Sequence, residues 1–286
     1  MLQEIASLGF EYAELSHGIR ISLLPGIFQA VDEGVIKIST LHNFCPLPMG
    51  VSHAAPNIYL FSSPNQRERE NAYRHSIKTL ETAERLNAKL VVLHMGMVEM
   101  KEYTDKLVEM IGEGKRDTSK YHKLCLELQE KREEKKEKYY LLSYDMLSRI
   151  LEKAEAVGLL LGIENREALE EIPFDHDFDL FFKEFTSPNI RYWHDTGHAQ
   201  IKENLGFINH VVQLENYSSR LAGFHIHDVE FPGKDHRSPG SGMIDFASIK
   251  PFVKPEHLKV FEFSPSLTME QAVAGIRHIK NLWGTD

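Results

Sequence analysis

The stretch LLLGIEN (159–165) is an apolar run that ends on a single glutamate, Glu164. The arrangement recurs three times: IRYWHD (190–195) ends on Asp195, LAGFHIHD (221–228) carries His225, and LKVFEF (258–263) carries Glu262. Each apolar run is typical of a buried β-strand. Parallel barrels carry their chemistry at the carboxyl ends of their strands. One reactive side chain per strand end therefore predicts a barrel in which the four side chains converge.

Two glutamates, one aspartate and one histidine form a characteristic set of metal ligands. Carboxylate oxygens with one imidazole suit Mn²⁺, Zn²⁺, Co²⁺ or Mg²⁺. For Glu164 the alternative is a structural ion pair, because Arg166 lies two residues away. Buried acids are nevertheless rare unless they are paired or bind a ligand. We predict one divalent ion bound by Glu164, Asp195, His225 and Glu262, with a second or third ion as the alternative.

Length and composition restrict the class of protein. The chain has 286 residues and 42% hydrophobic residues, which fits one α/β barrel of about 250 residues or two small domains. The net charge of −9 argues against sequence-independent binding of nucleic acid, which depends on phosphate neutralisation. Only Cys45 and Cys125 are present, so no disulfide framework is expected. Neither a signal peptide nor a membrane span is evident, and we predict a cytoplasmic protein without a membrane partner.

Apolar runs alternate with segments of helical periodicity, the pattern of βαβ units and a parallel sheet. The expected strands are Tyr12–Leu15, Ile38–His42, Leu90–His94, Leu159–Glu164, Ile190–His194, Gly223–His227 and Val260–Phe263. The expected helices are Arg67–Leu86, Tyr140–Val157, Asp177–Phe185 and Thr268–Leu282, the last capped by Ser266 or Thr268. We predict a TIM-type (β/α)8 barrel whose first strand is missing. An uncovered sheet edge makes a homo-oligomer an open alternative.

The chain is expected to form one domain, residues 1–286, with a charged helical insertion near residues 99–140. The centre of this insertion, ELQEKREEKKEK (127–138), is almost entirely charged. A solvated helix face held by i,i+4 ion pairs is the interpretation that we favour. The alternative is an arm that binds a partner.

Eight short motifs, in order along the chain, resemble those of a known family. They are LGFEYAEL (8–15), LHNFCP (41–46), VVLHMG (91–96), GIENR (162–166), WHDTGHA (193–199), GFHIHD (223–228), HRSPGSGMIDF (236–246) and FEFSP (261–265). The chain resembles the xylose isomerase-like TIM-barrel superfamily, and in particular its sugar-phosphate isomerase/epimerase branch. The resemblance runs from Leu8 to Trp283. It implies the same four metal ligands that the strand ends suggest.

Endonuclease IV belongs to the same superfamily and resembles this chain at further positions. The additional metal ligands implied by that resemblance fall on His42, His94, His198 and His236. One more acidic ligand would fall on Lys234, and Asp235 is displaced from that position by one residue. A charged lysine cannot bind a metal ion, which argues against a complete three-metal site.

Five histidines are predicted to contact the substrate, because each lies at a strand end or in a loop that follows one. They are His42, His94, His198, His227 and His236. His225 and His227 are two residues apart and share one face of their strand. The family match favours His225 as the metal ligand of the two.

The leading hypothesis is a metal-dependent isomerase or epimerase that acts on a small sugar or sugar phosphate. Glu164 and Glu262 would transfer the proton, through an enediolate. The alternatives are an endonuclease IV-like phosphodiester hydrolase, a related dehydratase or lyase, and a binding protein on a catalytically silent barrel. Nucleic acid is not an expected partner.

Overall fold

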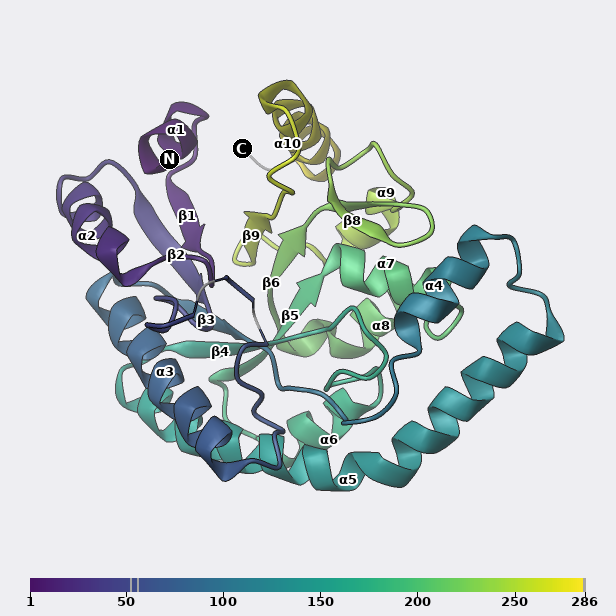
Figure 1. The fold of residues 1–286 in the computed structure, drawn as a ribbon. Helices are drawn as coiled ribbons and strands as arrows, with labels where there is room; N and C mark the ends of the chain where they lie inside the picture. The colour runs from purple at the N-terminus through teal and green to yellow at the C-terminus, as the bar shows by residue number, and fades with distance from the viewer. Residues whose placement is uncertain (52, 56, 285–286) are drawn as a thin grey trace. The chain divides into compact units, whose positions relative to one another are not determined.

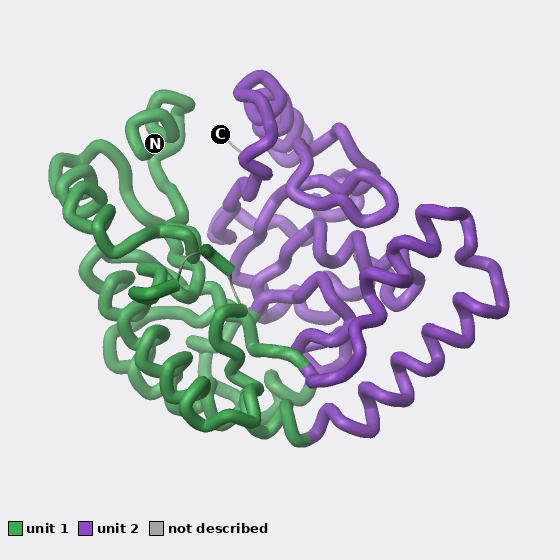
Figure 2. Tube along the Cα trace, in the orientation of Figure 1, with its two compact units in different colours: residues 1–97, 138–163, 180–191 green, residues 98–137, 164–179, 192–286 purple. Residues whose placement is uncertain are grey.

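The computed structural model describes residues 1–51, 53–55 and 57–284. The predicted domain, residues 1–286, also includes residues 52, 56, 285 and 286, which lie outside the described residues. The chain forms two compact units, drawn green and purple in Figure 2. Unit 1 comprises residues 1–97, 138–163 and 180–191, and unit 2 comprises residues 98–137, 164–179 and 192–286.

Strands and helices alternate along the chain (Figure 1). The strands are β1 (Tyr12–Leu15), β2 (Lys37–His42), β3 (Leu90–Leu93), β4 (Leu160–Glu164), β5 (Ile190–Asp195), β6 (Leu221–Ile226), β7 (Asp228–Glu230), β8 (Lys234–Arg237) and β9 (Leu258–Phe261). The α-helices are α1 (Leu2–Ser7), α2 (Leu24–Asp32), α3 (Gln66–Arg85), α4 (Thr104–Gly112), α5 (Ser119–Ala156), α6 (Asp177–Glu184), α7 (Thr196–Asn204), α8 (His210–Tyr217), α9 (Phe246–Ile249) and α10 (Met269–Trp283). Short 3-10 helices span Ile21–Leu23, Ser218–Arg220 and Lys250–Phe252.

In the described part of the chain, seven strands form one sheet in the order β1-β2-β3-β4-β5-β6-β9. The strand pairs β1–β2, β2–β3, β3–β4, β5–β6 and β6–β9 are parallel. Strands β4 and β5 each begin in unit 1 and end in unit 2. Parallel strands that are buried on both faces have continuous apolar sequences. Strand β3, with the sequence LVVL, is an example, because all four of its residues are buried. The seven predicted strands are therefore confirmed, and no strand precedes helix α1 among the described residues.

One pair of strands is absent from the prediction. Strands β7 and β8 form an antiparallel ribbon directly after β6, with Asp228 opposite Arg237. Both strands are short and polar, so neither produces an apolar run that would identify it in the sequence. The ribbon carries Asp235 and His236.

The predicted helices are present, and their ends have clear causes. The Thr268 side chain caps α10 in a capping box with Gln271, and Gly284 ends the helix at a φ of 69°. Asn65 caps α3 by accepting the backbone N–H of Arg67. No helix among the described residues combines the length and the apolar character needed to span a bilayer.

The charged insertion near residues 99–140 contains α4 and the first half of one long helix, α5, which also contains the predicted helix Tyr140–Val157. Most of its charged side chains are exposed, as expected for a solvated face. Arg132 is the exception, since it is only 2% exposed. Its guanidinium donates to the carbonyl oxygens of Leu169 and Glu171 at 2.9 Å and to Asp177 at 2.6 Å. Within unit 2, the helix therefore anchors the loop that follows β4.

A chain of four buried side chains connects β5 with α7 and α8 in unit 2. Tyr192 Oη lies 2.8 Å from His194 Nδ1, and His194 Nε2 lies 2.9 Å from Nε2 of His210. His210 Nδ1 lies 3.4 Å from the amide oxygen of Gln200. All four side chains are at most 5% exposed. His194 and His210 are therefore structural residues of unit 2.

The side chain of Gln200 fixes the direction of the hydrogen bonds that link these four side chains. Its amide nitrogen donates to Glu203 at 3.1 Å and to Asn204 at 3.0 Å, so its oxygen faces His210. A carbonyl oxygen only accepts, so Nδ1 of His210 carries the proton and Nε2 accepts from His194. Burial disfavours a charge on either imidazole and so favours the neutral form of both.

Acidification is expected to destabilise the protein through these histidines. Burial lowers the pKa of His210 to about 4 and also lowers the pKa of His194. Below about pH 6.5, the unfolded chain binds protons that the folded chain cannot, so the free energy of unfolding falls. The loss for His210 should reach about 3 kcal/mol near pH 4. Urea denaturation over this range would measure it.

Two variants separate this effect from the titration of carboxylates. His210→Gln should flatten the slope of unfolding free energy against pH, whereas the exposed control His122→Gln should leave it unchanged. Equal slopes for the wild type and His210→Gln would contradict the assignment.

Candidate metal centre

The four predicted metal ligands lie at the carboxyl ends of strands within unit 2. Glu164 is the last residue of β4 and Asp195 is the last residue of β5. His225 is the penultimate residue of β6, and Glu262 directly follows β9. Strands β5, β6 and β9 are paired in parallel, so these ends share one edge of the sheet.

The four side chains meet at one nitrogen atom. Nδ1 of His225 lies 2.6 Å from Glu164 Oε1, 3.2 Å from Glu262 Oε2 and 3.8 Å from Asp195 Oδ2. The side chains of Glu164, Asp195 and His225 are at most 1% exposed, and that of Glu262 is 27% exposed. Three carboxylates around one imidazole nitrogen concentrate negative charge in a buried space, which is costly unless a cation is shared among them. The set therefore fits a divalent metal ion chemically.

Glu164 is held from both sides. One carboxylate oxygen contacts Nη1 of Arg166, and the other faces His225. Arg166 also donates from Nε to Glu171 at 3.1 Å. The ion pair that the sequence offers as the alternative for Glu164 is thus present, but it uses only one of the two oxygens. The second oxygen faces Nδ1 of His225.

Asp195 is positioned by backbone and side-chain donors. The His198 backbone N–H donates to Oδ1 at 2.7 Å, and His227 Nε2 donates to Oδ2 at 3.0 Å. The Asn165 side chain bonds both the N–H and the carbonyl oxygen of Asp195, at 2.7 and 2.9 Å. Asn165 was missed from the sequence, although its place after Glu164 in GIENR is a signal. These bonds orient the carboxylate that faces His225.

His227 is fully buried and stacks on His236, with ring centroids 4.2 Å apart and planes 7° from parallel. Its Nδ1 accepts the backbone N–H of His236 at 2.9 Å, so its proton lies on Nε2 and is donated to Asp195. Both ring nitrogens are engaged within the protein. The geometry gives His227 an orienting contact with Asp195, while its predicted contact with substrate stays a prediction.

His236 lies between two carboxylates. Its Nδ1 is 3.0 Å from Asp235 Oδ2, and its Nε2 is 3.7 Å from Glu262 Oε2. Burial by itself lowers the pKa of His236, but the two carboxylates outweigh burial and raise the pKa to about 11. Burial likewise raises the pKa of Glu262, and the imidazoles of His225 and His236 reverse this to a lowered pKa. Glu262 is thus an ionised carboxylate that can accept a proton.

A further group of side chains could hold a metal ion: Glu167, His198 and Asp235. Burial, and then repulsion from Asp235, raises the pKa of Glu167 to about 7. Lys234 does not take part, because its side chain is 65% exposed and lies 3.7 Å from Glu230. Glu167 and Asp235 were not predicted as site residues, since neither ends an apolar run.

The two remaining predicted histidines belong to unit 1, at the ends of β2 and β3. Their rings pack edge to face with centroids 4.7 Å apart, and the ring of His17 packs against His42 at 5.1 Å. Nδ1 of His94 lies 3.2 Å from the Asn57 amide oxygen. Substrate contacts by His42 and His94 stay predictions.

Asp228 organises the loop that follows the ribbon. It is fully buried, and its carboxylate accepts the backbone N–H groups of Val229, Gly240, Gly242 and Ile244 at 2.8–3.0 Å. Four backbone donors satisfy the hydrogen-bonding capacity of this buried carboxylate. Asp228 is thereby turned away from His225 and His227, as strand alternation predicts.

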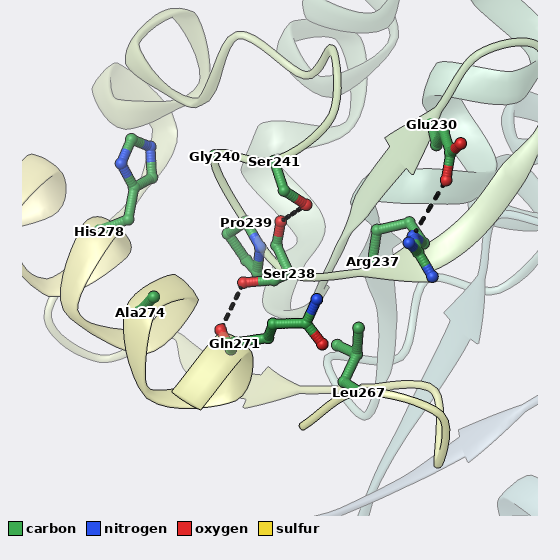
Figure 3. Close-up of a pocket in the computed structure, with 10 residues that line it drawn as sticks. All are labelled: Glu230, Arg237, Ser238, Pro239, Gly240, Ser241, Leu267, Gln271, Ala274 and His278. Carbon is green, nitrogen blue, oxygen red and sulfur yellow. Dashed lines mark hydrogen bonds and ion pairs between the residues drawn. The ribbon is translucent and has the colours of Figure 1, made fainter. Parts of the chain in front are cut away.

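A separate pocket of about 640 Å³ opens in unit 2 between the 237–241 loop and α10 (Figure 3). Several of its polar groups are paired with one another, as the dashed lines in Figure 3 show. Ser238 Oγ donates to the carbonyl oxygen of Gln271, and Arg237 pairs with Glu230 at 3.3 Å. None of the four predicted metal ligands lines it. We assign the pocket no part in the metal centre.

Comparison with known proteins identifies a family and a shared fold. The family described as xylose isomerase-like TIM barrel matches residues 2–281. The crystal structure of a D-tagatose 3-epimerase-like protein is 19% identical, with a TM-score of 0.70 over 99% of this chain and 91% of that one. The 3-keto-D-glucoside 4-epimerase YcjR from E. coli is 15% identical, with a TM-score of 0.67 over 98% and 92%. An IolI protein with a bound zinc atom is 16% identical, with a TM-score of 0.67 over 99% and 91%. No curated protein matches the sequence.

Proposed function

Because the chain belongs to the xylose isomerase-like TIM-barrel family, we propose that it is a metal-dependent isomerase or epimerase of a sugar or sugar phosphate. The observation that carries the proposal is the convergence of Glu164, Asp195 and Glu262 on Nδ1 of His225. Solved structures of the same fold include sugar epimerases and an IolI protein that holds a zinc atom. These likenesses support the class of reaction rather than a particular substrate.

The metal ion would be held by Glu164, Asp195, His225 and Glu262, and would supply Lewis acidity that polarises a substrate carbonyl and acidifies the neighbouring C–H. The chain's own carboxylates then move the proton. Glu164 and Glu262 come from the ends of different strands, and each has an oxygen within 3.2 Å of His225 Nδ1. One removes the proton to give an enediolate, and the other returns it. Proton transfer by a positioned side chain contributes about 10²–10⁴-fold.

The surrounding residues prepare the two carboxylates for these roles. Arg166 holds one oxygen of Glu164 and leaves the other directed inward. His236 lies beside Glu262, and its raised pKa keeps the imidazole protonated, which stabilises the ionised carboxylate. Asp195 is not assigned a proton, because His198 and His227 occupy both of its oxygens.

The proposal is tested first by counting metal ions. Wild-type protein purified without chelator should contain at least about one divalent ion per chain by mass spectrometry of its metals. Glu262→Ala should lose that ion, and Glu215→Gln, an exposed control on α8, should keep it. Wild-type protein that binds none of Mn²⁺, Zn²⁺ or Co²⁺ would reject the proposal.

The second test follows the reaction itself. Ketohexoses including D-fructose and D-tagatose, which appear with related epimerases, are incubated with the protein in D₂O. Deuterium should enter at the carbon next to the carbonyl, and chelation of the metal should stop it. The phosphodiester hydrolase alternative predicts cleavage of a phosphodiester instead, with no deuterium entering the sugar.

A further inference from the structure

We infer that unit 2 binds a second divalent cation through Glu167, His198 and Asp235. Glu167 lies in the loop after β4, His198 in the first turn of α7, and Asp235 on β8. One ligand atom of each side chain lies within 4.8 Å of the other two. Ligand atoms around one tetrahedral ion are about 3.3–3.6 Å apart, because each bond is about 2.0–2.2 Å. A shift of each ligand atom by less than about 1 Å therefore brings all three onto one ion.

The imidazole of His198 is already arranged as a metal ligand. Its Nδ1 lies 3.0 Å from the carbonyl oxygen of Asn165, which can only accept, so Nδ1 carries the proton. Arg166 Nη1 lies farther from the same nitrogen, at 3.4 Å, and already contacts Glu164. The lone pair of His198 is thus on Nε2. Metal-binding histidines commonly use one nitrogen for the ion and donate the other to a carbonyl or a carboxylate.

The two carboxylates of the cluster lack a basic partner that would neutralise both. Glu167 forms no ion pair with a basic side chain in the described part of the chain. Arg166, which follows Asn165, pairs with Glu164 and Glu171 instead. Asp235 has one partner, His236, at 3.0 Å. A divalent cation between Glu167 and Asp235 would replace their mutual repulsion by two favourable contacts.

The cluster differs from the extra metal ligands that the resemblance to endonuclease IV implies. That resemblance requires an acid at position 234, where this chain has an exposed lysine. Asp235 supplies a carboxylate from the adjacent position, and Glu167 supplies one that the resemblance does not involve. Two carboxylates and one imidazole suit Zn²⁺, Mn²⁺ or Co²⁺ and leave positions open for water or a substrate oxygen. The inference goes beyond the proposed reaction and does not depend on it.

Metal stoichiometry tests the inference. Wild-type protein is stripped with a chelator, equilibrated with Zn²⁺ or Mn²⁺, separated from free metal and analysed by mass spectrometry. About two ions per chain are expected for the wild type and about one for the double variant Glu167→Gln, Asp235→Asn. The control Glu215→Gln, which removes one exposed carboxylate on α8 and so matches each single variant in charge, should keep two. Circular dichroism establishes that each variant is folded. If the double variant does not fold, the metal content of the single variants Glu167→Gln and Asp235→Asn is measured in its place.

The possible outcomes separate this inference from the proposed function. One ion in the wild type, or two in both the wild type and the double variant, would overturn the inference. If that single ion is lost in Glu262→Ala, the four-ligand centre stands while the second site falls. If Glu262→Ala retains one ion and the combination with Glu167→Gln and Asp235→Asn retains none, both sites are supported. A wild type without any ion would reject both.

Discussion

Replacement of Glu164 or Glu262 by glutamine is expected to abolish exchange of the substrate C–H proton with solvent. Glutamine keeps the size of the side chain but cannot accept the proton, so the loss should be about 10²–10⁴-fold. Both residues also contribute an oxygen to the predicted metal centre, so weaker metal binding should add to the loss. The measurement is deuterium incorporation from D₂O, followed by NMR in the presence of saturating metal.

The controls for this prediction separate chemistry from folding. Glu215→Gln removes the same charge from an exposed site on α8 and should exchange at the wild-type rate. The unfolding free energies of both active-site variants should be measured beside it, because Glu164 is buried and paired with Arg166. Persistent exchange in both Glu164→Gln and Glu262→Gln would reject the assignment of these residues as the proton-transfer groups.

Gly197→Ala is expected to cause the second large loss, in both stability and metal binding. A Cβ atom at position 197 would lie 2.1 Å from Cε1 of His227, where no pair of atoms can stay. The His227 ring is held by Asp195, by the backbone of His236 and by stacking on the ring of His236. Because the ring has no free direction to move, the backbone or Asp195 must shift.

The expected size of the Gly197→Ala effect follows from overpacking. The free energy of unfolding should fall by about 1–3 kcal/mol or more. Metal affinity should fall by about 10–100-fold, because Asp195 loses its orienting partner. Gly26→Ala is the matched control, since a Cβ atom there would meet no atom within 4 Å and the residue lies in helix α2. It should be neutral or stabilising by up to about 1 kcal/mol. Equal effects at the two glycines would contradict this account.

Much of the fold could be predicted because its signals are local. The apolar runs around Leu90–Leu93 and Leu160–Glu164 are buried parallel strands, and such strands are apolar regardless of what they pack against. Strand ends differ from the prediction by up to two residues, as for β9, which spans Leu258–Phe261. The ribbon β7–β8 was missed because its residues are polar and its two strands are short.

The sequence also placed the charged segment 127–138 on a solvated helix, with one error. Arg132 lies in the same charged run as its neighbours, yet it is buried and bonded to Asp177 and to two carbonyl oxygens. Nothing local distinguishes it from the adjacent lysines and glutamates. Its role depends on the loop after β4, which is distant in sequence.

The sequence by itself determined the order of the seven sheet strands, and it placed Glu164, Asp195, His225 and Glu262 at strand ends, because burial and alternation act over a few neighbouring residues. Only the tertiary structure decided which atoms face one another. It directed one oxygen of Glu164 to Arg166 and the other to His225, and it brought Glu167 and Asp235 to His198. These contacts join residues that are tens of positions apart, and their geometry depends on how the loops fold back on the strand ends.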